Sequence, residues 1–218
     1  MKNTTVSRPS KTKAGTRSLV ESWHGGADIE ILQYARSLQR AARTLLGKLE
    51  REQNPRTDWD ACPVVLLYRQ ALEIKLKMLV GEGSKFPPSP TDPISLFRTT
   101  SLRWLAQVVC QIIKKVGWES EFTCDGVSSP AEFRALVNEV ESFDPVARAI
   151  RSSRTGEADS VSEYFRRFDI LQFATRLDAL LMLLDFTAGG LAATWDMQQE
   201  GLAGGKFDGG AYFKPTIQ

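Results

Sequence analysis

Apolar residues recur with a helical period along most of the chain. From Asp28 to about Gln53 they follow three- and four-residue steps, which predict one long helix with a single buried stripe. The stripe consists of Ile31, Ala35, Leu38, Ala42, Leu45 and Leu49. A second helix is expected from about Asp60, a candidate N-cap, to the glycines of VGEG, and its nearly continuous apolar surface predicts a central position. The segment SKFPPSPTDP that follows is predicted to be a loop, because proline removes backbone donors.

Three further helices complete the predicted set. One covers roughly residues 94 to 116 and buries Phe97, Leu105, Val108, Ile112 and Val116. A shorter one begins at Ser129-Pro130 and buries Phe133, Leu136, Val137 and Val140. The last begins near Phe168, with Ile170, Phe173, Leu177, Leu180, Leu184, Leu191 and Trp195 along its seam. A brief helical turn is expected after Asp144-Pro145, then a loop over RSSRTGEADS. The pattern predicts an all-α protein, a single helical bundle of about five main helices over residues 27–200.

Both ends of the chain lack this periodicity. Residues 1–26 hold five basic residues against one acidic residue, Glu21, and have a net charge of +4. Since the whole chain has a formal charge of +2, the remainder is slightly acidic, at −2. We expect residues 1–26 to be a basic flexible tail; their composition also resembles a transit peptide, but nothing amphipathic supports that alternative. Residues 201–218 are Gly-rich and are expected to form a flexible tail or a strap.

The composition disfavours several classes of site. The chain has 1 His and 3 Cys, and Cys62, Cys110 and Cys124 form no CxxC pair, so we expect no metal. No GxxxxGK, GxGxxG or GxSxG motif is present, and no cofactor is expected. An odd thiol count without a signal peptide predicts a cytoplasmic protein. The run ALLMLL, between Asp178 and Asp185, is too short to span a bilayer, so no membrane partner is expected.

Three charged residues interrupt the apolar second helix. Arg69, Glu73 and Lys77 follow at four-residue steps and share one face. Buried charges are costly unless they are paired, so the three are expected to join a hydrogen-bonded network. The network is interpreted either as a structural device that fixes helix register or as part of a functional site.

A second charged cluster lies in the segment DPVARAIRSSRTG. Its arginines are Arg148, Arg151 and Arg154, and guanidinium groups match phosphate oxygens. Asp144 and nearby acidic residues offer internal partners, so a ligand contact and an internal salt-bridge set remain equal alternatives. In an intermediate hypothesis, Asp144 or Arg148 completes the Glu73 network. The predicted polar network then comprises Arg69, Glu73, Lys77, Asp144, Arg148 and Arg151.

A line of arginines follows one face of the first helix. Arg36, Arg40, Arg43 and Arg51 lie opposite the apolar stripe, where they either meet phosphates or form a solvated surface. The residues expected at any phosphate contact are Arg36, Arg40, Arg43, Arg151 and Arg154.

Four segments, in order, resemble HEPN-like proteins of bacteria. LYRQALEIKLKMLV is similar to the helix Tyr-Arg-(His/Gln)-Ala-Leu-Glu-x-x-Leu-Lys, and TTSLRWL to a later helix start with Thr100 in place of His. DPVARAIRSSRTG resembles a segment Asp-x-x-Ser-x-x-Phe-Arg-Tyr before Gly, with Ile150 and Ser152 in place of the aromatics. FDILQFATRLDALLMLLDF resembles the closing helix, which begins at Asp169. These segments span roughly residues 28 to 190.

The resemblance implies a homodimeric bundle in a defence, toxin–antitoxin-like or RNA-processing system. Members that cut RNA use Arg followed by four to six residues and His. In this chain only Arg17 and His24 have that spacing, and they precede the predicted bundle. We therefore expect a non-catalytic binding and assembly module, with RNA, a nucleotide or a partner protein as ligand. The alternatives are a metal-independent RNA endonuclease, with Glu73 as base and Arg151 and Arg154 at the phosphate, and a nucleotide-sensing module.

Overall fold

Five α-helices make up most of the chain that the computed structural model describes, which is residues 27–51, 61–86, 98–143 and 169–199. They are α2 (Ala27–Arg51), α3 (Ala61–Gly83), α5 (Leu102–Val116), α6 (Pro130–Ser142) and α9 (Ile170–Gln199). Within these ranges the β-type pairing is one isolated bridge between Cys124 and Val127. The predicted all-α bundle of about five main helices is confirmed.

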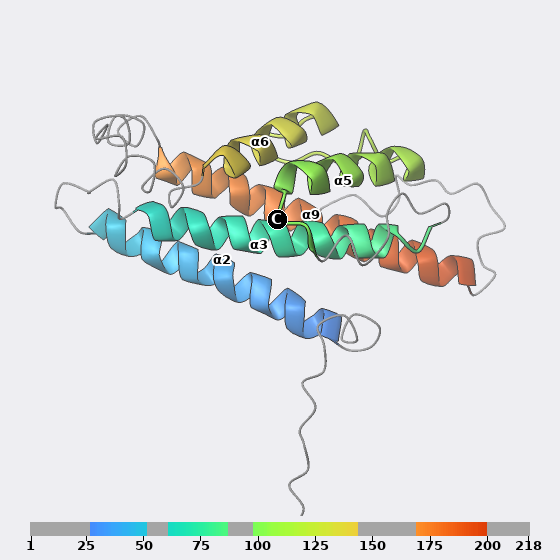
Figure 1. The fold of residues 1–218 in the computed structure, drawn as a ribbon, viewed down its shortest axis with the longest axis horizontal. Helices are drawn as coiled ribbons and strands as arrows, with labels where there is room; N and C mark the ends of the chain where they lie inside the picture. The colour runs from blue at the N-terminus through green and yellow to red at the C-terminus, as the bar shows by residue number, and fades with distance from the viewer. Residues whose placement is uncertain (1–26, 52–60, 87–97, 144–168, 200–218) are drawn as a thin grey trace, which may run out of the picture.

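The helix α3 lies at the centre of the bundle, as its apolar sequence predicts. It packs against α2, α9 and α5, and α6 packs on α5 (Figure 1). The faces of α3 differ little in hydrophobicity, because three neighbouring helices cover it. The long helices α2, α3 and α9 run side by side, and α5 and α6 form a second pair along one edge (Figure 1).

A single hydrophobic core joins all five helices. Fully buried side chains include Tyr68 and Leu72 from α3, Phe133 from α6 and Leu177 from α9. The ring of Phe173 on α9 contacts Tyr68 edge-on, with ring centroids 6.3 Å apart, and stacks on Phe143 at 6.2 Å. The core positions that the periodicity predicts in α5, α6 and α9 are buried where the structure describes them, except that Val116 and Trp195 are only partly covered. In α2 the predicted stripe is buried at Ala35 and Ala42, whereas Ile31, Leu38, Leu45 and Leu49 are only partly buried.

Side-chain caps set three helix starts. Ser101 caps α5 by accepting a hydrogen bond from the backbone N–H of Trp104, so this helix begins at Leu102. The prediction of one continuous helix over residues 94 to 116 is therefore wrong, because Thr99, Thr100 and Ser101 are not helical and separate α5 from Arg98, which is helical. Ser129 caps α6 with Pro130 in its first turn, as predicted, and Asp169 Oδ1 accepts from the N–H groups of Leu171 and Gln172 at the start of α9.

Several predictions concern residues outside the described ranges. They are the two tails (1–26 and 201–218), the N-cap at Asp60, the part of the proline-rich loop over residues 87–93, Phe97, the turn after Asp144-Pro145 and the loop over residues 151–160. These remain predictions from sequence.

Candidate functional site

The structure brings together the three charged residues of α3. Glu73 is only 7% exposed, and its Oε1 accepts a hydrogen bond of 2.7 Å from Lys77 Nζ. Arg69 Nη1 lies 4.0 Å from the other carboxylate oxygen. The buried carboxylate is therefore held by two cations from its own helix, which offset the cost of its desolvation.

The second half of the predicted polar network lies outside the described residues. This applies to Asp144, Arg148, Arg151 and Arg154. Whether Asp144 or Arg148 completes the Glu73 network remains a prediction, as does the phosphate contact of Arg151 and Arg154.

The arginine line of α2 is divided between two roles. Arg43 Nε donates a 2.8 Å hydrogen bond to Asp178 Oδ2, and Arg36 lies 3.5 Å from Asp185 Oδ2, so both point toward α9. Arg40 instead bonds the hydroxyl of Ser37 on its own helix, at 3.2 Å. Arg36 and Arg43 are exposed, in agreement with the solvated surface that the sequence offers as one alternative. They also pair with carboxylates of α9, which the periodicity of α2 alone does not reveal.

Two polar layers cross the bundle where α2, α3 and α9 meet. In the first layer, Asp178 Oδ1 accepts from Gln39 Nε2 at 2.7 Å and from the hydroxyl of Tyr68 at 3.0 Å, in addition to its bond with Arg43. Burial, followed by the charge of Asp178, raises the pKa of Tyr68 well above its usual range, so the phenol remains a donor. The hydrogen bond to Asp178 is the main cause of a raised pKa for Arg43.

The second layer is built around Asp185. Lys75 Nζ lies 2.7 Å from Asp185 Oδ2 and donates to the backbone carbonyl of Leu181 at 3.2 Å, while Arg36 approaches from the solvent side. The layers repeat at a seven-residue step on every helix: Arg36 and Arg43, Tyr68 and Lys75, Asp178 and Asp185. The order of the contacts makes α2 antiparallel to α3 and α9, and α3 parallel to α9.

Sequence reasoning missed Tyr68, Lys75 and Gln39 as polar partners, and it treated the two aspartates only as limits of an apolar run. The shared seven-residue spacing was the available signal. It does not identify the partner helices by itself, because many charged residues of a helical chain have such a spacing.

Lys75 predicts an unusual dependence of stability on pH. Burial lowers its pKa below the usual 10.5, and Asp185 only partly opposes this effect. Between the lowered pKa and 10.5 the unfolded chain binds more protons, so this residue makes the free energy of unfolding rise with pH in that window. We expect wild-type protein to gain stability relative to Lys75→Met as pH increases from neutral to 10.5, measured by urea unfolding at one protein concentration. A pH-independent difference between the two proteins would contradict a lowered pKa.

The described residues offer little for nucleophilic or metal chemistry. No group of three or more His, Cys, Asp or Glu in this part of the chain could hold a metal ion. Burial is the main cause of the raised pKa values of Cys110 and Cys124, the latter to about 11, so both thiols are protonated near neutral pH. The charged side chains of each polar layer are paired with one another, and Glu73 is paired with Arg69 and Lys77.

One described helix is long and apolar enough to cross a membrane. The stretch is Ile170–Gln198 of α9, a longer window than the run ALLMLL, which is too short by itself. A core helix of a soluble protein satisfies the same criteria. In α9, 44% of the apolar window is buried, and Asp178 and Asp185 in this helix pair with cations of α2 and α3.

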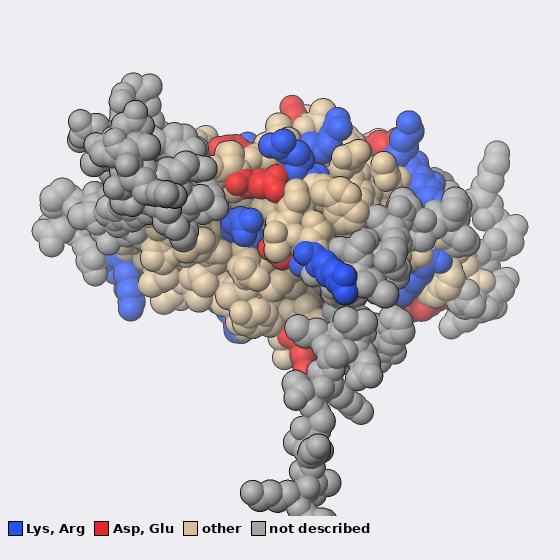
Figure 2. All heavy atoms as spheres, in the orientation of Figure 1, with Lys and Arg blue, Asp and Glu red and all other residues tan. Residues whose placement is uncertain are grey.

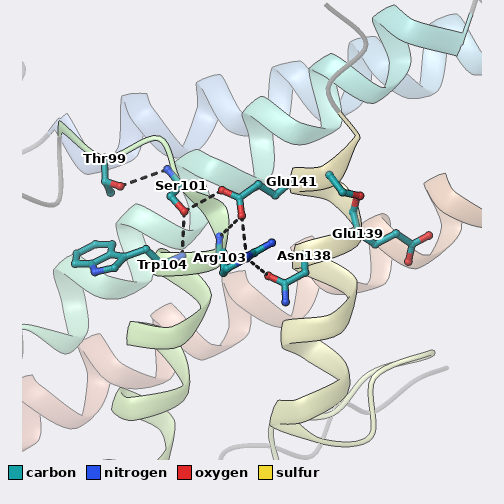
Figure 3. Close-up of polar contacts among 8 residues, drawn as sticks. Thr99, Ser101, Arg103, Trp104, Asn138, Glu139 and Glu141 are labelled. Atoms are coloured by element: carbon teal, nitrogen blue, oxygen red, sulfur yellow. Dashed lines mark hydrogen bonds and ion pairs between the residues drawn. The ribbon is translucent and has the colours of Figure 1, made fainter. Parts of the chain in front are cut away.

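A further polar cluster joins the start of α5 to the end of α6. Glu141 accepts from the Ser101 hydroxyl at 2.9 Å and from the backbone N–H of Arg103 at 3.2 Å, so this carboxylate helps to cap α5 (Figure 3). Arg103 Nε donates to Asn138 Oδ1 at 3.2 Å and lies 3.6 Å from Glu141 Oε2. Glu139 points away from this cluster in the same view and pairs with Arg176 of α9.

Comparisons with known proteins leave the family unassigned. The chain matches no family model, no curated protein and no solved structure. The similarity to HEPN-like proteins therefore rests on the four sequence segments that carry it.

Proposed function

We propose that this chain is a HEPN-like binding and assembly module that forms a homodimer in the cytoplasm, within a bacterial nucleic-acid-related or defence system, and that does not itself cut RNA. The observation that carries the proposal is an apolar strip on the outer face of α9. Leu171, Met182 and Phe186 are exposed there to 37%, 55% and 56%. Large exposed side chains on one helix face are typical of protein–protein contacts.

The α9 strip consists of Leu171, Thr175, Met182, Phe186 and Gly189, which the helical period places on one face. The opposite face carries core residues such as Leu177 and Leu184. A Cβ added at Gly189 would have no atom within 4 Å apart from its chain neighbours and the nearby backbone of its own helix. A partner helix could therefore approach the backbone closely at this point.

A second copy of the chain is the occupant that fits the strip best. Asp178 and Asp185 border it, and Arg43 and Arg36 already pair with them. Two copies of the strip can therefore meet without bringing unpaired like charges together, which would otherwise oppose a symmetric contact. The resemblance to HEPN-like proteins also implies a dimer.

The surroundings of Glu73 support the non-catalytic part of the proposal. A general base needs a free carboxylate within reach of substrate, whereas Glu73 is buried and bonded to Lys77 at 2.7 Å. To act as base, it would have to break this ion pair inside the protein, at a cost of several kcal/mol.

Charge insertion tests the dimer. In Met182→Glu and Phe186→Glu we expect a change from dimer to monomer, because each places a carboxylate in an apolar contact. Light scattering coupled to size-exclusion chromatography measures the change. Gln172→Glu is the matched control, since Gln172 is exposed on the same helix but lies outside the strip. A monomeric wild-type protein, or a dimer that survives both substitutions, would reject the α9 strip as the interface.

Incubation with mixed RNA in EDTA tests the catalytic alternative. We expect no cleavage by the purified protein. Cleavage that disappears in Arg151→Ala, while the circular dichroism spectrum stays unchanged, would favour the endonuclease and refute the non-catalytic proposal.

A further inference from the structure

A groove lies between α5 and α6, the pair of helices along one edge of the bundle. Its volume is about 400 Å³, and it is open to solvent. Four polar side chains and two alanines line it: Arg103, Gln107, Arg134, Asn138, Ala131 and Ala135. The short alanine side chains leave space between the two helices, and the polar groups surround this space.

Arg103 is held in place while most of its donors stay available. Its Nε bonds Asn138 and lies near Glu141, as the dashed lines of Figure 3 show. Among the described residues, neither terminal nitrogen of this guanidinium has a hydrogen bond, and the side chain is 70% exposed. A guanidinium fixed through Nε presents its two outer nitrogens as a preformed fork, which suits the oxygens of a phosphate group.

Arg134 supplies a second cation from the opposite helix. Over the described ranges no carboxylate lies within ion-pairing distance of it, in contrast to Arg36, Arg43 and Arg176. The amides of Gln107 and Asn138 add neutral donors along the same groove.

The surface over α5 and α6 carries charges of both signs. On the face that Figure 2 shows, Lys and Arg side chains lie there beside Asp and Glu side chains. The positive charge of the groove is therefore local to Arg103 and Arg134, which line it. The paired arginines of α2 are less suited to a new anion, because a phosphate would have to displace Asp178 or Asp185.

We infer that the α5–α6 groove is a phosphate-binding site, with Arg103 and Arg134 on the phosphate oxygens and the RNA backbone as its ligand. The inference deepens the proposed function and rests on it for the class of ligand. A nucleotide carries the same phosphate chemistry, so the test includes both sources. The groove, instead of Arg36 and Arg43, then provides the principal contact to RNA in the described part of the chain.

Fluorescence anisotropy with a labelled single-stranded 12-nucleotide RNA tests the groove on the full chain. We expect Arg103→Ala/Arg134→Ala to weaken binding by about tenfold or more at moderate salt, since two charge-assisted contacts are lost. The slope of log affinity against log salt should decrease by about 1.4, which is about 0.7 for each lost contact to a single strand. Gln107→Glu is a second variant that removes no native contact and is expected to weaken binding in the same direction, because it adds a carboxylate to the groove.

Arg40→Ala is the control for a charge lost outside the groove, since it removes one positive charge from an exposed arginine of α2, whereas the groove variant removes two. A loss with Arg40→Ala as large as that of the groove variant would overturn the inference, as would wild-type protein that binds neither RNA nor ATP. If ATP raises the melting temperature of wild type but not of the groove variant, while RNA binding is unchanged by the variant, the ligand is a nucleotide and the RNA assignment is wrong. If the groove variant binds RNA normally and ATP has no groove-dependent effect, the site is refuted. The dimer would be unaffected by that result, so the assembly proposal is judged separately by light scattering.

Discussion

Asp185→Ala is expected to lower the free energy of unfolding by about 3 kcal/mol, because it leaves the ammonium group of Lys75 buried without a carboxylate. The Lys75 side chain is 2% exposed and lies 2.7 Å from Asp185, and its remaining acceptor is the carbonyl of Leu181. Urea unfolding followed by circular dichroism measures the change.

Two variants show whether the unpaired buried ammonium group, or another effect of the substitution, causes the loss of stability in Asp185→Ala. Arg36→Ala removes the solvent-side partner of Asp185, an arginine side chain that is 55% exposed, and should cost only about 0.5 kcal/mol. Lys75→Met/Asp185→Leu removes both buried charges and should return to within about 1 kcal/mol of wild type. Equal losses from Asp185→Ala and from the double variant would show that packing at α9, and not the unpaired ammonium, causes the effect.

Gly83→Ala is expected to destabilise the protein by about 1–3 kcal/mol through overpacking. A Cβ at Gly83 would lie 2.5, 2.7 and 2.8 Å from three side-chain atoms of Ile112. Because Ile112 is only 2% exposed, it cannot move aside into solvent. The end of α3 therefore depends on the absence of a side chain where it crosses α5. Thermal unfolding of the variant measures the cost.

Gly47→Ala serves as the control for helix propensity. Gly47 lies in α2, and nothing lies within 4 Å of the position that its Cβ would take. Alanine is favoured over glycine inside a helix, so this variant should gain about 0.5–1 kcal/mol. If Gly83→Ala gained stability as Gly47→Ala is expected to, the close approach of Gly83 to Ile112 would be refuted.

The helices could be predicted from sequence because their signals are local. The buried stripe of α6, from Phe133 to Val140, and its cap at Ser129-Pro130 both follow from neighbouring residues, and both are confirmed. The start of α5 was predicted too early, because apolar residues around position 94 extend the period although Ser101 caps the helix.

The polar contacts were harder to predict because they join distant segments. The pairing of Glu73 with Lys77 follows from a four-residue step on one helix. The bond between Tyr68 and Asp178 links positions 110 residues apart and depends on which faces of α3 and α9 meet. The α5–α6 groove depends in the same way on the packing of two helices, since Arg103 and Arg134 are ordinary surface residues in sequence.

The seven-residue repeat of the two polar layers also restricts sliding between helices. Seven residues correspond to about 10.5 Å along a helix, so α9 displaced by one repeat would keep only one of its aspartates opposite a layer. In one direction of slippage Lys75 would lose its carboxylate, and in the other Tyr68 and Gln39 would lose theirs. Intermediate displacements would match neither layer. The two layers therefore fix the position of α9 along α2 and α3 at two points. The leucines of α3 and α9 would not do so by themselves, because one leucine can replace another in the contact.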